Sequence, residues 1–141
     1  MTKSNSIDFS SLQKAIKSLQ EAIQVYQSDK TNTFVRDASI QRFEYTYELC
    51  HKMLKRFLEA TESNSVEIDS MTFQTLIRTG AEKGLLKNSW DKWSEFKTAR
   101  NLTTHTYNEK KALEVCNILP EFLVESEYLF SQLTKRSVSD E

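Results

Sequence analysis

The chain has 141 residues but contains only two glycines and one proline, the residues on which tight turns depend. β-Hairpins, sandwiches and barrels need such residues at many of their turns, so an all-β architecture is excluded. A chain of this length suits one domain and can bury a sufficient core without disulfides or metals. With 38% hydrophobic and 28% charged residues, its composition is that of a globular protein. We therefore expect a single all-α domain over residues 1–141.

An excess of charge of one sign is also lacking, because 19 basic and 20 acidic residues leave a net charge of −1. The whole molecule therefore does not attract nucleic acid electrostatically, and RNA binding would need a local basic cleft, for example at a dimer interface. No stretch is long and apolar enough to span a membrane, and residues 1–4 lack the apolar core of a signal peptide. We expect a cytoplasmic protein without membrane contact.

Cysteine and metal-ligand motifs are scarce as well. Cys50 and Cys116 are the only cysteines, and each is in phase with an apolar stripe, which favours buried reduced thiols over a disulfide. The two histidines form no HxxxH or HExxH pair, and there is no CxxC. Glu44 and Glu48 lack the ExxH partners that a di-iron bundle needs. There is no glycine-rich phosphate loop. We expect neither a metal nor a cofactor.

Apolar residues recur at the i, i+3, i+4, i+7 spacing of amphipathic helices along most of the chain. Pro120 should kink or break the last helix near Cys116, and Gly84 suits the left-handed residue after the short third helix, which Ser70 should cap. We expect a loop over residues 61–69 and disorder over residues 137–141. The pattern predicts an up-and-down, four-helix-type bundle with an additional short helix. The expected helices cover approximately residues 10–26, 34–60, 71–83, 90–104 and 109–136.

The second expected helix carries two stripes. The apolar stripe has the spacing of a bundle seam and consists of Ile40, Phe43, Tyr47, Cys50, Leu54 and Phe57. The polar stripe lies one residue round from it and consists of Gln41, Glu44, Glu48, His51 and Lys55. This polar stripe is either a solvated flank or the lining of a functional groove. If it lines a groove, the candidate groove or partner-contact residues are Arg42, Glu44, Glu48 and His51.

The run Arg-Asn-Leu-Thr-Thr-His-Thr-Tyr at residues 100–107 concentrates the groups best suited to chemistry. Arg100 presents a planar fork that binds phosphate oxygens, and His105 is suited to proton transfer. Asn101 can orient the imidazole or hold a phosphate oxygen. The hydroxylated residues around Thr104 weaken a helix, so the helix should end or turn there and allow His105 to approach Arg100.

These residues allow more than one interpretation. Arg100 and His105 together could cleave RNA without a metal, with His105 moving a proton and Arg100 stabilising the charge that develops on phosphorus. In a purely structural interpretation, Arg100 pairs with an acidic neighbour and His105 caps a helix end. The run would then only maintain a packing interface.

Two segments resemble the signatures of a known family. Residues 35–49, Val-Arg-Asp-Ala-Ser-Ile-Gln-Arg-Phe-Glu-Tyr-Thr-Tyr-Glu-Leu, resemble the helix-2 signature of the nucleotidyltransferase substrate-binding proteins. Residues 100–109 resemble their second signature. This family belongs to the HEPN superfamily of helical bundles, the higher eukaryote and prokaryote nucleotide-binding domains. Two long motifs in the right order make the resemblance specific. As departures, His51 stands where relatives often have an aromatic residue, and Thr104 and Asn108 replace commoner Ser and Asp.

The resemblance implies a helical bundle that forms a homodimer and pairs with a small, separately encoded nucleotidyltransferase of the minimal type. The chain would be the substrate-binding half of a two-component or toxin–antitoxin pair. As an alternative, the HepT-like toxin relatives imply a metal-independent ribonuclease. Arg100 and His105 would be its catalytic residues, with Asn101 and Thr104 in supporting or RNA-binding roles. In that alternative Tyr107 would accept a nucleotidyl group from the partner, which silences the ribonuclease.

Overall fold

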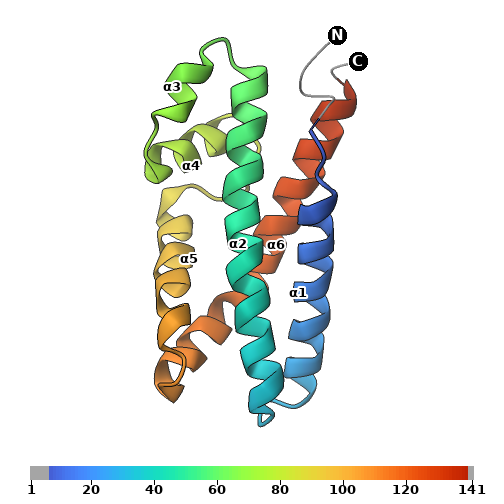
Figure 1. The fold of residues 1–141 in the computed structure, drawn as a ribbon, viewed down its shortest axis with the longest axis vertical. Coiled ribbons are helices and arrows are strands. Elements are labelled where there is room, and N and C mark those ends of the chain that lie inside the picture. Colours follow the sequence, from blue (N-terminus) through green and yellow to red (C-terminus); the bar gives the residue numbers. More distant parts are fainter. Residues whose placement is uncertain (1–6, 140–141) are drawn as a thin grey trace.

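The computed structural model describes residues 7–139, and all regular structure within that range is helical. Three long helices, α1, α2 and α6, run along the bundle, and α4 and α5 follow one another along the other side of α2 (Figure 1). The expected all-α, four-helix-type bundle is therefore confirmed. The elements are α1 (Ser10–Ser28), α2 (Thr33–Thr61), α3 (Ser65–Asp69), α4 (Phe73–Glu82), α5 (Trp90–Leu102), the 3₁₀-helix η2 (Thr103–His105) and α6 (Glu109–Ser139).

Helix α2 forms the centre of the bundle and packs against α1, α4, α5 and α6. Its first turn is capped by Asn32, whose Oδ1 accepts hydrogen bonds from the backbone N–H groups of Phe34 and Val35. All six residues of the expected apolar seam are buried. Cys50 and Cys116 are buried free thiols, as expected, and burial raises the pKa of both.

The expected loop over residues 61–69 is wrong in part, because α3 forms within it. The side chain of Asn64 accepts a hydrogen bond from the backbone N–H of Glu67, and Ile68 is buried against the core. Ser70 ends α3 and does not cap the next helix. The cap of α4 is Thr72, whose Oγ1 accepts the backbone N–H of Thr75 at 3.2 Å.

Helix α6 continues through Pro120 without a break, and its first turns run obliquely across the bundle (Figure 1). Pro120 has no backbone N–H to donate to the carbonyl of Cys116. Buried side chains on both sides of it, including Leu119 and Phe122, hold the helix against the core. The helix extends to Ser139, so the expected disorder is wrong for residues 137–139. Residues 140–141 lie outside the described range.

Gly84 has a φ of 77°, as the sequence predicted for the residue beyond α4. Its carbonyl accepts a hydrogen bond from the Tyr128 hydroxyl of α6 at 3.3 Å. This turn leads the chain into the linker before α5. The run at residues 100–107, called the motif below, begins in the last turn of α5. Within residues 7–139, no helix combines the length and the hydropathy that crossing a bilayer requires.

Candidate functional site

The motif occupies the junction between α5 and α6, where the helix geometry changes. Helix α5 ends at Leu102, and Thr103–His105 continue as the 3₁₀-helix η2. The Thr103 hydroxyl donates back to the Arg100 carbonyl at 2.8 Å, a contact that competes with helix continuation. The chain then turns, with the backbone N–H of Asn108 donating to the His105 carbonyl at 3.1 Å. The helix therefore ends near Thr104 as predicted.

Arg100 is held by two carboxylates of α2. Its Nε donates to Glu48 Oε2 at 2.9 Å, and its Nη1 lies 3.3 Å from Glu44 Oε2. Nη1 also donates to Thr103 Oγ1 at 3.3 Å. The sequence left open whether Arg100 pairs with an acidic neighbour, and the structure shows that it pairs with two. The guanidinium therefore lies between the motif and the polar stripe of α2.

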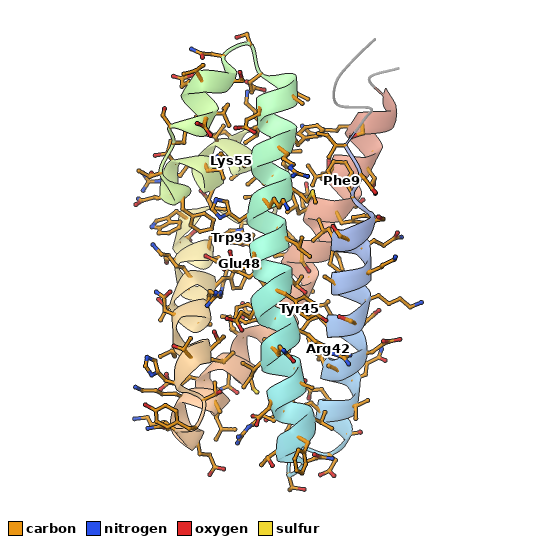
Figure 2. All side chains as sticks on the ribbon, viewed as in Figure 1. Phe9, Arg42, Tyr45, Glu48, Lys55 and Trp93 are labelled. Atoms are coloured by element: carbon orange, nitrogen blue, oxygen red, sulfur yellow. The ribbon has the colours of Figure 1, made fainter. Side chains whose placement is uncertain are left out.

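Arg100, Glu44 and Glu48 line an open groove of about 600 Å³ on the surface of α2, to which α5 contributes Arg100. Figure 2 shows Glu48 on the side of α2 that faces α5. The groove combines two carboxylates with two cations, so the formal charges of its lining cancel. Its lining residues are Gln41, Glu44, Tyr45, Glu48, Leu49, Lys52 and Arg100.

His105 and Tyr107 lie beyond the end of α5 and point away from the core. Tyr107 is 86% exposed, and its ring centroid lies 6.1 Å from that of His105 in an edge-on arrangement. Asn101 and Thr104 are also exposed. Arg100 is directed toward α2, whereas His105 lies beside Tyr107. The structure thus pairs Arg100 with α2 in the groove and leaves His105 and Tyr107 accessible at the corner of the bundle.

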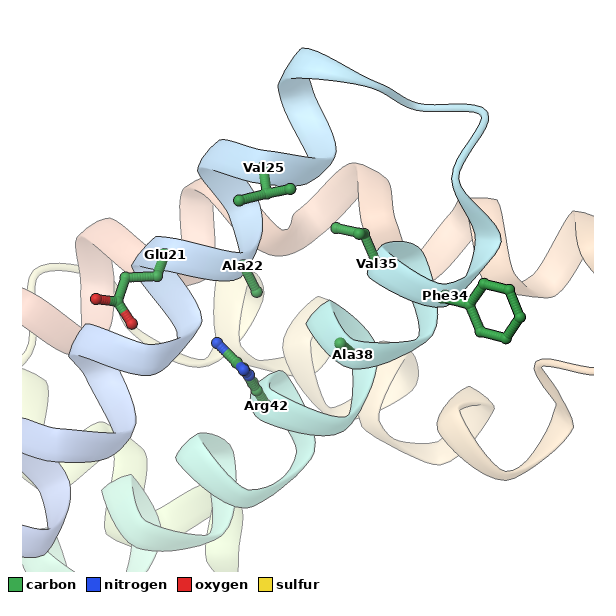
Figure 3. A pocket seen from close by; sticks show the side chains of 7 residues that line it. All are labelled: Glu21, Ala22, Val25, Phe34, Val35, Ala38 and Arg42. Atoms are coloured by element: carbon green, nitrogen blue, oxygen red, sulfur yellow. The ribbon is translucent and has the colours of Figure 1, made fainter.

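Arg42 and His51 do not belong to this groove. Arg42 Nη1 donates to the Ser18 carbonyl of α1 at 2.7 Å, and its side chain lines a separate pocket of about 250 Å³ between α1 and α2 (Figure 3). The His51 ring packs edge-on against Phe73 of α4 with 4.7 Å between centroids. Both residues therefore have packing partners that explain their positions.

The environment of His51 makes the stability of the fold pH-dependent. Burial lowers the pKa of His51 below its usual 6.5, although Glu48 opposes the shift. Since the unfolded chain then binds the proton more readily, the contribution of His51 to stability is complete above pH 6.5 and is lost as the pH drops from 6.5 through the lower folded pKa. We expect His51→Phe to remove this component, measured as urea midpoints across that window. A pH dependence identical to that of the wild type would contradict the assignment.

Sequence reasoning missed three groove residues, Tyr45, Leu49 and Lys52. Tyr45 follows Gln41 by four residues, Leu49 follows Tyr45 by four, and Lys52 follows Leu49 by three. This helical spacing places them on one face of α2 beside the polar stripe. The Tyr45 hydroxyl lies 2.6 Å from Ser18 Oγ, which links this face to α1. Within residues 7–139, no group of three or more His, Cys, Asp or Glu side chains could hold a metal ion.

Comparisons with known proteins show the family and the fold to which this chain is similar. A Haemophilus influenzae protein named as a probable ribonuclease HepT is 37% identical over 102 residues, which cover 72% of this chain and 69% of that protein. A solved Haemophilus influenzae structure, described as having the fold of a substrate-binding domain of a nucleotidyltransferase, superposes with a TM-score of 0.84 at 31% identity. The superposition covers 90% of this chain and 99% of the Haemophilus influenzae chain.

A crystal structure of a protein from Thermus thermophilus superposes with a TM-score of 0.71 at 30% identity, covering 86% of this chain and 98% of that one. The family model described as nucleotidyltransferase substrate binding protein like matches residues 7–135. That range includes all of α1 to α5 and most of α6, and both sequence signatures. The chain belongs to the nucleotidyltransferase substrate-binding protein-like family.

Proposed function

We propose that this chain is the helical, substrate-binding partner of a small, separately encoded nucleotidyltransferase, in a two-component or toxin–antitoxin pair. The observation that carries this proposal is the accessible corner formed by η2 and Tyr107, in a chain without a glycine-rich phosphate loop. A phenol that is 86% exposed can enter the active site of a second protein. The solved Haemophilus influenzae structure, described as having the fold of a substrate-binding domain of a nucleotidyltransferase, supports the same pairing.

The test is to mix the purified chain with a small nucleotidyltransferase from the same genome, chosen first from a neighbouring gene, and a labelled nucleoside triphosphate. We expect a stable complex on gel filtration and faster nucleotidyl transfer than with the nucleotidyltransferase alone. Tyr107→Phe should keep the complex, and it should lose any label that is transferred to this chain. If the two proteins formed no complex and the transfer rate did not change, the proposal would be contradicted.

The second candidate is a metal-independent ribonuclease that uses Arg100 and His105. Two observations favour it: His105 is exposed at the end of α5, and the Haemophilus influenzae relative is named as a probable ribonuclease. His105 would take the proton of an RNA 2′-hydroxyl, whose oxygen attacks phosphorus to form a 2′,3′-cyclic phosphate, while the 5′-oxygen leaves and takes up a proton from water. Arg100 would stabilise the charge on the phosphorane. A homodimer would place two copies of the pair near one strand and offset the lack of net positive charge.

Nucleotidyl transfer to Tyr107 fits the same scheme as a silencing step. The phenol oxygen would attack the α-phosphorus of a nucleoside triphosphate in the partner, forming the O–P bond and releasing pyrophosphate. The added nucleotide would carry a negative charge next to His105, whose ring lies 6.1 Å from that of Tyr107. RNA would then be repelled at the place where the proton transfer occurs.

The ribonuclease is tested by incubating the chain alone with RNA and a chelator. We expect His105→Ala to slow cleavage by at least about a hundredfold, the usual contribution of a general acid or base. His51→Phe is the matched control, because it removes the other histidine and should leave cleavage unchanged. Equal cleavage by the wild type and His105→Ala would show that the activity belongs to a contaminant and not to this chain.

A further inference from the structure

The two carboxylates on Arg100 engage its Nε and Nη1 groups, two of the three nitrogens through which a guanidinium binds phosphate. Glu48 accepts from Nε at 2.9 Å, and Glu44 lies 3.3 Å from Nη1. Arginine binds phosphate and carboxylate oxygens through the same planar fork of N–H groups. In this arrangement Arg100 has already bound two anionic groups of its own chain. A phosphate can therefore use both Nε and Nη1 of Arg100 only after displacing these carboxylates.

The exposure of the three side chains suits such an exchange. Arg100 is 26% exposed, Glu44 36% and Glu48 53%, so water reaches all of them. Ion pairs that are this accessible to solvent add little to stability, because desolvation is incomplete and side-chain entropy is lost. Opening the contact would leave the buried seam of α2 untouched. The pairing therefore restrains Arg100 without being necessary for the fold.

The charges in the groove add a second barrier to an anionic ligand. A phosphodiester that enters beside Arg100 and Lys52 must also approach Glu44 and Glu48, which repel it. The positive charge of Arg100 is thus neutralised where it would be useful. Release of the two carboxylates would free the Arg100 guanidinium to face an anionic ligand.

We propose that Glu44 and Glu48 form a carboxylate clamp that autoinhibits phosphate binding at Arg100. In the closed form seen here, Arg100 is paired within the chain, and RNA binds weakly. RNA phosphate displaces the carboxylates and forms the open form. This inference rests on the proposed role of Arg100 in holding RNA phosphate, and it assigns regulation to that site.

The test measures the binding of a fluorescently labelled single-stranded RNA by anisotropy. All proteins carry His105→Ala, so that the RNA stays intact. We expect Glu44→Gln with Glu48→Gln to tighten binding by about tenfold, the effect of removing two exposed ion pairs and their repulsion. Adding Arg100→Ala to that variant should abolish the gain. Circular dichroism verifies that each protein is folded.

The chain provides a matched control on another surface. Lys92 of α5 is also paired with two carboxylates, Glu95 at 3.4 Å and Glu121 at 2.7 Å. Glu95→Gln with Glu121→Gln removes the same net charge from the same kind of contact, outside the groove. RNA binding should change less than twofold in this control.

Equal gains in the two double variants would overturn the clamp, because net charge would then explain them. Unchanged or weaker binding in the groove variant, or a gain that survives Arg100→Ala, would overturn it too. The ribonuclease proposal fails separately, if cleavage is the same with and without His105. Tighter RNA binding by Glu44→Gln with Glu48→Gln, but not by the control variant, therefore supports the clamp whatever the outcome of the cleavage assay.

Discussion

Glu125→Ala is expected to destabilise the fold by roughly 3 to 5 kcal/mol, because several hydrogen-bond donors lose their acceptor and each buried donor left unsatisfied costs about 1 to 3 kcal/mol. The Glu125 carboxylate is fully buried and accepts four hydrogen bonds. The donors are the backbone N–H groups of Lys87 and Asn88 at 3.0 and 3.2 Å, Asn88 Nδ2 at 2.6 Å and Trp93 Nε1 at 3.1 Å. Truncation leaves these donors without their acceptor, and the Trp93 donor is buried where water does not replace it.

The measurement is urea unfolding, with Glu121→Ala as the control. Glu121 lies one turn before Glu125 on α6, and its carboxylate is 55% exposed in an ion pair with Lys92. Its removal should change the free energy of unfolding by less than about 1 kcal/mol, as for other exposed pairs. Glu125→Gln should fall between the two, because the amide keeps one acceptor but presents an N–H₂ group to the donors. Equal losses for Glu125→Ala and Glu121→Ala would show that the network contributes little.

The Glu125 network connects the fold to the candidate site. Lys87 and Asn88 belong to the linker that precedes α5, and Trp93 lies in the first turns of α5. Because α5 carries Arg100 near its other end, the position of the groove depends on how α6 holds this linker.

The sequence predicted the site best where its signal was local. The hydroxylated residues after Arg100 predicted the end of α5, and Gly84 predicted the left-handed turn. The pairing of Arg100 with Glu44 and Glu48 could not be predicted, because it joins residues that are more than fifty positions apart. Periodicity placed each group on a face of its own helix, but it did not specify which faces of α2 and α5 meet.

Short or polar elements of the core were missed for a related reason. Helix α3 spans Ser65–Asp69, which is too short to show a helical period, and a single buried residue, Ile68, holds it to the core. Glu125 stands three residues after Phe122 and four before Leu129, both fully buried, so its position is that of a core residue. A carboxylate at such a position signals a buried network, but its partners on the α4–α5 linker are visible only in the folded chain.

Phe122→Ala is expected to cost about 3 to 5 kcal/mol, because it removes a fully buried ring and leaves a cavity among others. Its ring lies 4.9 to 6.2 Å from four aromatic neighbours, which come from both α2 and α5. The neighbours are Phe43, Tyr47, Trp93 and Phe96.

Those neighbours restrict how far the core can collapse into the space that Phe122→Ala leaves, because each already packs against others of the group. Phe34→Ala is the matched control: the same atoms are removed from a side chain that is 87% exposed, and the change should stay within about 0.5 kcal/mol. Both losses of unfolding free energy are measured from the urea midpoints, provided that the dependence of that free energy on urea concentration stays constant. A loss below about 1 kcal/mol for Phe122→Ala would mean that α2, α5 and α6 repack around the gap, and the aromatic cluster would then not set the spacing of the helices that build the groove.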